Sequence, residues 1–196
     1  MSLKKFASVA CCSLLSVACV AQMVPAQTAH QEPMGEMKAD ATASKRPLPS
    51  PAETAEVSLG GKKLVIRYNA PSMRGRKIMG GIVPYGQVWR TGANPATTLV
   101  TAANLTIGTL TVPAGTYTLY TLPAEDTWML IVNKQTGQWG TVYNQGQDLG
   151  RTPMTANPLA KAQETMSISF ENTKGNSTEL HVKWESTDRF VAVTAQ

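Results

Sequence analysis

The sequence predicts an all-β domain, built as an antiparallel two-layer β-sandwich of a jelly-roll-like or open-barrel kind. From Ala55 onward, apolar and polar residues alternate with the period of two that is typical of half-buried strands. The alternating runs are short, rich in Val, Thr, Tyr and Trp, and separated by turns that contain glycine or proline. Helical periodicity is almost absent, and only Pro158–Gln163 suits a short helical turn.

The first residues of the chain predict export. Two lysines precede an apolar run of small residues at 6–21, which is typical of a signal peptide and too short for a membrane span of about 20 residues. Leu15–Cys19 resembles a lipobox in which Cys19 would carry a lipid, whereas Val24–Ala26 suits ordinary signal cleavage. We therefore expect residues 1–26 to be an export signal. The protein would be periplasmic or extracellular, in contact with the membrane only through this signal or a lipid anchor.

Residues 27–50 have the composition of a flexible tether, and residues 51–196 are expected to form a single β domain. All three cysteines belong to the export signal, so the remaining domain has no disulfide and no thiolate metal site. Without the two lysines of the signal, the formal net charge falls from +5 to +3. This mild excess is unlike the clustered positive charge of nucleic-acid-binding proteins.

The expected strands begin with a hairpin, in which Glu56–Leu59 and Lys63–Tyr68 flank a turn at Gly60–Gly61. In chain order, the later expected strands are Leu105–Ile107, Leu110–Val112, Thr116–Leu122, Trp128–Asn133, Met166–Phe170, Leu180–Trp184 and Phe190–Val193. Alternation in one of these strands places Trp128, Leu130 and Val132 on the face that we expect to meet the core.

A long loop rich in glycine and arginine separates the first hairpin from the later strands. Between Glu56 and Glu125 the chain has seven basic side chains and no acidic one. Guanidinium groups suit carboxylate or phosphate oxygens, glycines allow close approach of the backbone, and aromatic side chains stack on sugar rings. The candidate ligand-binding residues are Arg74, Arg76, Tyr85, Trp89, Arg90, Asn94 and Arg151.

The same side chains also suit an internal role. Arg90 and Arg151 would then pair with Asp148 or Glu164 and hold the loop onto the sheet, because buried ion pairs fix a conformation without binding any ligand. In this alternative, the core would be filled by Trp89, Trp128 and Trp139.

Few residues of the chain suit catalysis or metal binding. The two histidines are His30, in the tether, and His181, which alternation places on a solvent-facing side of its strand. We therefore expect no metal site, no cofactor and no Ser-His-Asp triad. Glycoside hydrolysis needs two carboxylates, and Asp148 is the weak candidate for an acid or base in the motif-like segments.

Several segments together match a known family pattern. They are YNAPS at 68–72, RGR at 74–76, GGIVPYG at 80–86, VWRTGAN at 88–94, ATT at 96–98, PAGTY at 113–117, LP at 122–123, Trp128, NK at 133–134, QWG at 138–140, Tyr143, Asp148 and Arg151. On these segments the chain resembles the bacterial family named domain of unknown function 2911, over essentially all of residues 50–196. The resemblance implies an exported or envelope-located β-sandwich domain and no established activity.

The sequence thus predicts an exported bacterial envelope domain that binds a small anionic or carbohydrate ligand, or an envelope partner, and that catalyses no reaction. Two alternatives remain open. One is a hydrolase of envelope glycans or esters in which Asp148 acts as the acid or base. The other is a purely structural interaction domain.

Overall fold

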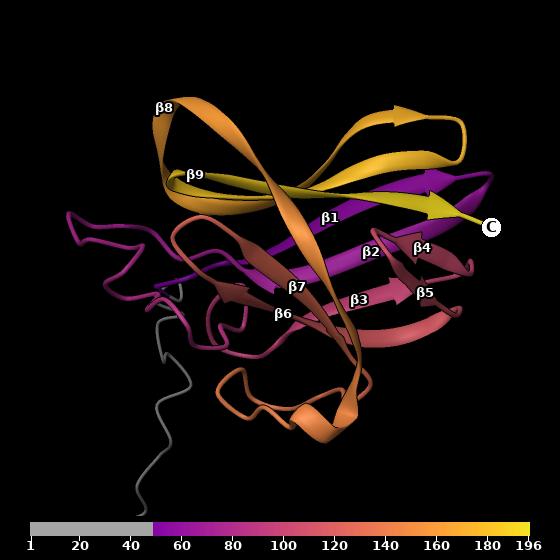
Figure 1. Ribbon diagram of the computed structural model, residues 1–196, viewed down its shortest axis with the longest axis horizontal. Coiled ribbons are helices and arrows are strands. Elements are labelled where there is room, and N and C mark those ends of the chain that lie inside the picture. The colour runs from indigo at the N-terminus through magenta and orange to yellow at the C-terminus, as the bar shows by residue number, and fades with distance from the viewer. Residues whose placement is uncertain (1–48) are drawn as a thin grey trace, which may run out of the picture. The chain divides into compact units, whose positions relative to one another are not determined.

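The computed structural model of the protein describes residues 49–196, which contain an antiparallel sheet of nine strands and no α-helix (Figure 1). The strands are β1 (Ala52–Leu59), β2 (Lys62–Asn69), β3 (Thr97–Thr101), β4 (Leu105–Ile107), β5 (Leu110–Val112), β6 (Gly115–Pro123), β7 (Trp128–Asn133), β8 (Asp148–Lys174) and β9 (Ser177–Ala195). A single 3-10 turn, Gln145–Gln147, precedes β8. The predicted export signal, Cys19 and most of the predicted tether lie outside the described residues.

The strand order across the sheet is β1-β2-β3-β6-β7-β8-β9-β4-β5, and each neighbouring pair is antiparallel. The sheet is not closed into a barrel, because β1 and β5 remain its two edges. The prediction of an all-β antiparallel fold with a long Gly/Arg-rich loop is therefore confirmed at this level.

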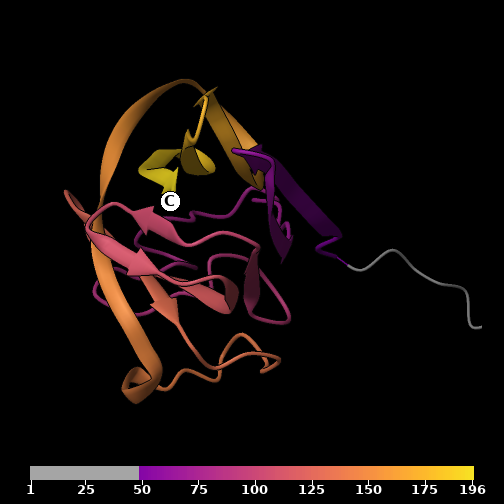
Figure 2. The same cartoon turned by 90° about the vertical axis from the view of Figure 1, so that its right-hand side faces the viewer.

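The longest strand, β8, joins the two parts of the sheet. Its first residues pair with β7, where Met154 lies opposite Trp128. Its remaining 20 or so residues pair with β9, from Thr155 opposite Phe190 to Lys174 opposite Ser177. In Figures 1 and 2, β8 is the long orange ribbon that runs from beside β7 to beside β9.

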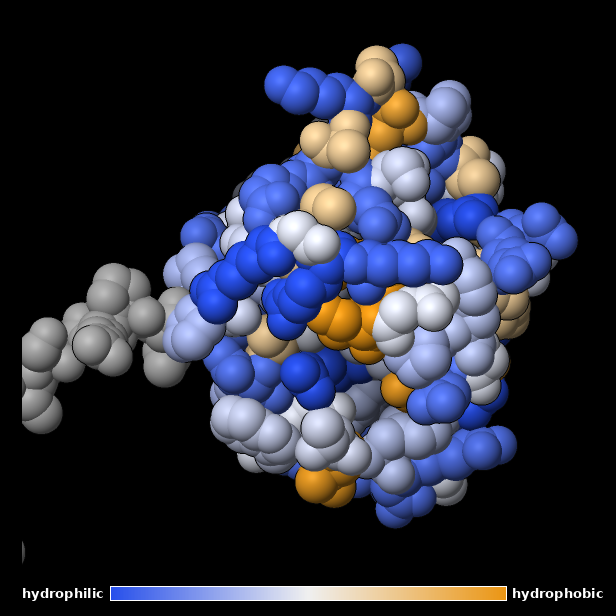
Figure 3. Space-filling model, turned by 90° about the vertical axis from the view of Figure 1, so that its left-hand side faces the viewer, coloured by the Kyte–Doolittle hydropathy of each residue, from blue (hydrophilic) through white to orange (hydrophobic). Residues whose placement is uncertain are grey.

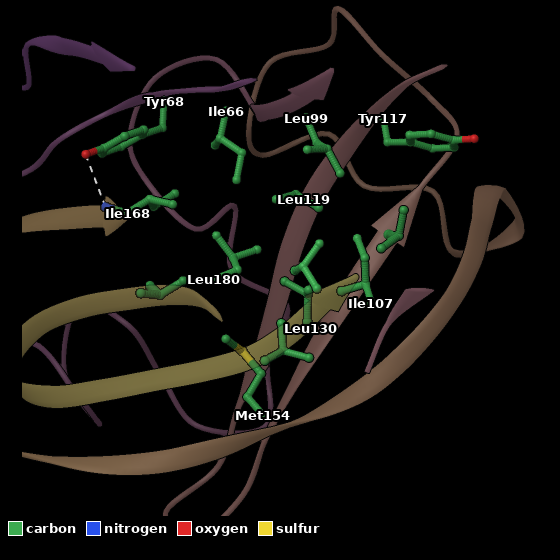
Figure 4. Close-up of a cluster of buried hydrophobic side chains, with 14 of the residues drawn as sticks. Ile66, Tyr68, Leu99, Ile107, Tyr117, Leu119, Leu130, Met154, Ile168 and Leu180 are labelled. Atoms are coloured by element: carbon green, nitrogen blue, oxygen red, sulfur yellow. Dashed lines mark hydrogen bonds between the residues drawn. The ribbon is translucent and has the colours of Figure 1, made fainter. Parts of the chain in front are cut away.

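One hydrophobic core receives side chains from both parts of the sheet. In Figure 4, residues of β2, β3, β6 and β7 point toward residues of the later strands, and the Tyr68 hydroxyl accepts a hydrogen bond from the Ile168 backbone N–H at 3.1 Å. Trp128, Leu130 and Val132 are all buried in this core, which confirms their predicted face. The other face of β7 is covered too, because Ile131 packs in a second, smaller cluster.

The loop between β2 and β3, residues 70–96, is folded onto the sheet. Ile78, Met79 and Val83 are buried in the main core, so the loop supplies part of it. The Met73 backbone N–H donates to the Glu164 carbonyl at 2.9 Å, which ties the loop to β8. The loop is therefore an ordered surface on which side chains can be presented.

The late part of the chain differs from the prediction in three respects. Met166–Phe170 is a section of β8 rather than a separate strand, and β9 contains both strands expected after it. Pro158–Gln163 is also part of β8 and forms no helical turn. Register shifts between β8 and β9 at this point interrupt the alternation, so the pattern breaks while the strand continues.

The third difference concerns His181, which was wrongly predicted to meet solvent and is only 2% exposed. Its imidazole is covered by residues farther along β9. Phe190 stacks on the ring with 5.0 Å between centroids, and the buried Asp188 carboxylate lies 2.9 Å from Nδ1. Alternation correctly separates His181 from the core face, but it says nothing about what covers the opposite face.

Candidate functional site

Two adjoining cavities lie where the loop at residues 70–96 meets the strands. The first, here called the Trp184 cavity, has a volume of about 260 Å³ and is lined by Trp184 of β9 together with loop residues that include Arg76 and Asn94. The second, the Tyr143 cavity, has a volume of about 350 Å³ and is lined by Tyr143, Tyr120 and Gln87, among others. Ile82, Trp89 and Arg90 line both cavities.

The position of Trp89 is fixed by its backbone and by its ring. Its backbone exchanges two hydrogen bonds with Thr121 of β6, at 2.8 and 2.9 Å. Its indole stacks on Trp184 with 5.9 Å between ring centroids, and it meets the buried Trp128 edge-on at 6.2 Å. These contacts hold the half-buried indole rigidly between the core and the two cavities.

Arg90 has no polar partner within residues 49–196. Its Nε atom is buried without a hydrogen bond, and no hydrogen bond or ion pair joins its side chain to Asp148, Glu164 or any other described residue. Gly140 lies in space beside the Arg90 side chain. A Cβ added at Gly140 would clash with Arg90 Cδ and lie 2.7 Å from the Asn94 carbonyl oxygen. Glycine at position 140 therefore leaves the room that the Arg90 side chain occupies.

The other loop arginines are already engaged. Arg76 lies in the wall of the Trp184 cavity, and its Nε and Nη2 donate to the carbonyls of Met73 and Ser72 at 2.9 and 2.8 Å. Arg74 is exposed, lines neither cavity, and donates from Nη2 to the Pro49 carbonyl at 2.7 Å. Among the described residues, no acidic side chain lines either cavity. Arg90 is thus a cation without a neutralising partner in the shared wall.

Asp148 pairs with Arg151, and the pair belongs to a closed network. Arg151 donates to Asp148 Oδ2 from Nε at 3.0 Å and from Nη2 at 2.9 Å. Tyr143 donates to the same oxygen at 2.7 Å, and Asn133 donates to Oδ1 at 2.8 Å. Burial, and next the neighbouring Asp148 carboxylate, raise the pKa of Tyr143 to about 12. This network fixes one wall of the Tyr143 cavity.

The structure brings together only some of the predicted site residues. Of the predicted residues, those that line the Trp184 cavity are Arg76, Trp89, Arg90 and Asn94, whereas Arg74, Tyr85 and Arg151 line neither cavity. Tyr85 is 38% exposed, and its ring lies beside Gly80. Of the tryptophans expected in the core, Trp128 is fully buried, whereas Trp139 is 54% exposed and does not fill the core.

Sequence reasoning did not assign Trp184, Tyr120 or Gly140 to the site. The alternating pattern places Trp184 and Tyr120 in strands and gives no sign of a role in the site, because only folding brings them beside the loop. Gly140 and Tyr143 belong to the segments that resemble the family, and this resemblance is the feature of the sequence that could have placed them in the site.

A second polar cluster surrounds His181 on β9. Besides Asp188, the imidazole meets Glu179, whose Oε2 lies 3.3 Å from Nε2. Nearby, Lys183 donates to Glu171 Oε1 at 2.6 Å. Burial alone would raise the pKa of Glu171, but hydrogen bonds from Lys183 and Ser169 outweigh it and hold that pKa below its usual value. The cluster is internally paired and lines neither of the two cavities.

Residues 49–196 contain no group of three or more His, Cys, Asp or Glu side chains placed to hold a metal ion. The same part of the chain has no helix with the length and apolar character needed to cross a membrane.

Comparison with known proteins gives one positive result. No curated protein matches the chain, and no solved structure does. Residues 50–193 match the family described as "Protein of unknown function (DUF2911)", and this match covers most of the chain and every residue that lines the two cavities. The chain therefore belongs to this family of proteins of unknown function.

Proposed function

We propose that this protein is an exported, non-catalytic binding domain that holds a small anionic or carbohydrate ligand in the cavities around Trp89 and Arg90. The observation that carries the proposal is the buried Nε of Arg90, which has no partner among residues 49–196. Leaving a buried donor unpaired costs about 1–3 kcal/mol, and more when the group is charged. An anionic oxygen in either cavity would accept a charge-assisted hydrogen bond from the Nη atoms of the same guanidinium, which form no hydrogen bond within residues 49–196.

The surroundings of Arg90 suit such a ligand. One cavity is lined by the half-buried ring of Trp89 and the other by that of Tyr143, and these rings pack on the buried Trp184 and Tyr120 respectively. Aromatic walls with a few fixed polar groups are typical of small-molecule sites. Because Trp89 is held by Thr121 and by its ring contacts, little ordering of the site would be needed on binding.

Hydrolysis is less well supported than binding. A hydrolase would need Asp148 to give or take a proton, but this carboxylate already accepts hydrogen bonds from Asn133, Tyr143 and Arg151. The export part of the proposal rests on the signal-like residues 1–26. It places the domain where envelope glycans and their acidic fragments occur.

The proposal is tested by the intrinsic fluorescence of the tryptophans during titration with galacturonate, N-acetylglucosamine and sulfate. The parent protein should show a saturable change with at least one of these probes, because Trp89 and Trp184 line the cavity. Arg90→Gln should raise the dissociation constant for that probe at least tenfold. Arg67→Gln is the matched control, because Arg67 is an exposed arginine of β2 that lines neither cavity. Equal responses from the parent and Arg90→Gln, or no saturable response from the parent, would refute the proposal.

A further inference from the structure

We infer that the ligand is an acidic oligosaccharide of at least two rings, which lies across Arg90 with its carboxylate at the guanidinium and one ring in each cavity. This inference rests on the proposed function and adds the class and the minimum length of the ligand. It follows from how the two cavities adjoin, what lines each of them, and how charge is distributed between them.

The two cavities have a common wall made of Ile82, Trp89 and Arg90. Their volumes, about 260 and 350 Å³, lie near the lower limit of the ~300–1,000 Å³ that small-molecule sites occupy. Taken together they fall well inside that range. A ligand that occupied only one cavity would leave the Arg90 wall of the other without a partner. An elongated ligand that crosses the common wall uses both.

Each cavity offers the same kinds of side chain. The Trp184 cavity combines the half-buried indole of Trp89 with Asn94, and the Tyr143 cavity combines the half-buried phenol ring of Tyr143 with Gln87. Aromatic faces stack on the apolar face of a sugar ring, and amides bond to its hydroxyl groups. Two similar surfaces on either side of one cation correspond to two successive rings of a polymer.

The face of the domain on which the loop lies is also hollowed. The loop is at the left of Figure 1, and Figure 3 views the molecule from that side. Near the middle of this view, hydrophobic side chains are exposed beside strongly hydrophilic ones, next to a recess in the surface. Among the residues that line the cavities, Ile82, Gln87 and Thr141 are exposed, so the site opens to solvent.

The charge of the site favours a carboxylate over a phosphate. The cavity walls contain no acidic side chain, and Arg90 is their cation without an internal partner among residues 49–196. A carboxylate carries one negative charge and matches one planar guanidinium. A phosphate monoester concentrates nearly two charges on a single group at neutral pH, whereas each uronate ring carries one, and Arg76, the other arginine of the lining, already donates from Nε and Nη2 to carbonyls.

The inference is tested by calorimetric titration of the full chain with two series of sugars: galacturonate and digalacturonate, and mannuronate and dimannuronate. Cellobiose serves as a neutral dimer, and inorganic phosphate as an anion without a ring. In at least one series, the acidic dimer should bind at least tenfold more tightly than its monomer. It should also bind at least tenfold more tightly than cellobiose and phosphate.

One variant tests the second ring directly. Thr141 is exposed and lines only the Tyr143 cavity, so Thr141→Trp should fill this cavity and leave the Trp184 cavity open. The dimer should then bind as weakly as the monomer, and the affinity of the monomer should be unchanged. Thr111→Trp, at an exposed position of β5 outside both cavities, is the matched control and should behave as the parent does.

The outcomes separate this inference from the proposed function. Equal affinity for acidic monomer and dimer would overturn the two-ring ligand and leave a single binding site intact. Equal affinity for cellobiose and the acidic dimers would overturn the acidic class. Tighter binding of phosphate than of any uronate would overturn the carboxylate. If none of these compounds bound, both the inference and the proposed function would fail.

Discussion

Arg90 and Arg151 are two half-buried arginines whose replacement by alanine should change stability by very different amounts. Arg151 donates twice to Asp148 and once to Tyr143, and its side chain is 29% exposed against 11% for that of Asp148. Breaking a fully buried pair costs roughly 3–5 kcal/mol, and breaking an exposed pair costs less than about 1 kcal/mol. The partial exposure of Arg151 puts the loss for Arg151→Ala between these limits, at about 2–3 kcal/mol.

Arg90→Ala removes no hydrogen bond within residues 49–196, so the free energy of unfolding should change by less than about 1 kcal/mol. Urea and thermal unfolding, followed by circular dichroism, measure both variants. Each 1 kcal/mol should lower the melting temperature by about 2–4 °C in a domain of this size. A double-mutant cycle of Arg151→Ala with Asp148→Asn should give a coupling energy of about 1–3 kcal/mol. If Arg90→Ala destabilised the protein as much as Arg151→Ala, Arg90 would have a structural partner and the binding argument would fail.

Three further predictions concern the core, the pH dependence and the N-terminus. Trp128 is fully buried in the main core, so Trp128→Ala should lower the free energy of unfolding by about 3–5 kcal/mol in urea denaturation, and an unchanged midpoint would contradict its place there. The pKa of Tyr143, raised to about 12, predicts a late phase in the absorbance titration at 295 nm, and Tyr143→Phe should reduce the amplitude of this phase. Because the folded pKa lies above the unfolded value of about 10, the contribution of Tyr143 to stability is complete below pH 10 and is lost as the pH rises toward 12. Mass spectrometry of the native protein should find a chain that lacks at least residues 1–18, and an intact Met1 in a cytosolic fraction would refute export.

Strand positions could largely be predicted, because alternation within a few residues is a local property of the chain. The hairpin β1–β2 and the strand Trp128–Asn133 follow it directly. The continuity of β8 could not be predicted, since register shifts around Pro158–Gln163 break the alternation. Strand β3, Thr97–Thr101, was not predicted, because it directly follows the Gly/Arg-rich loop and was counted with it.

The candidate site could be predicted only on its loop side. Charge and composition singled out Trp89 and Arg90, because a local excess of arginine and glycine is visible in the sequence. The strand side could not be found in this way, since Trp184 comes to the loop through pairing between distant segments. The sequence suggested both Arg90 and Arg151 as partners of Asp148, and only the structure shows that the partner is Arg151.

The pairing of β4 with β9 constrains the order in which the domain can be completed. Leu105 of β4 lies opposite Ala195, so residues near the middle of the domain pair with the last residues of the chain. Ribosomes and export channels deliver a protein N-terminus first, and within residues 49–196 the only strand that pairs with the β4–β5 hairpin is β9. Until Val193–Ala195 arrive, the backbone N–H and C=O groups on the outer side of β4 have no strand to pair with. The sheet thus stays incomplete until β9 has been delivered, so a chain threading through a translocation channel would remain in an open state compatible with passage.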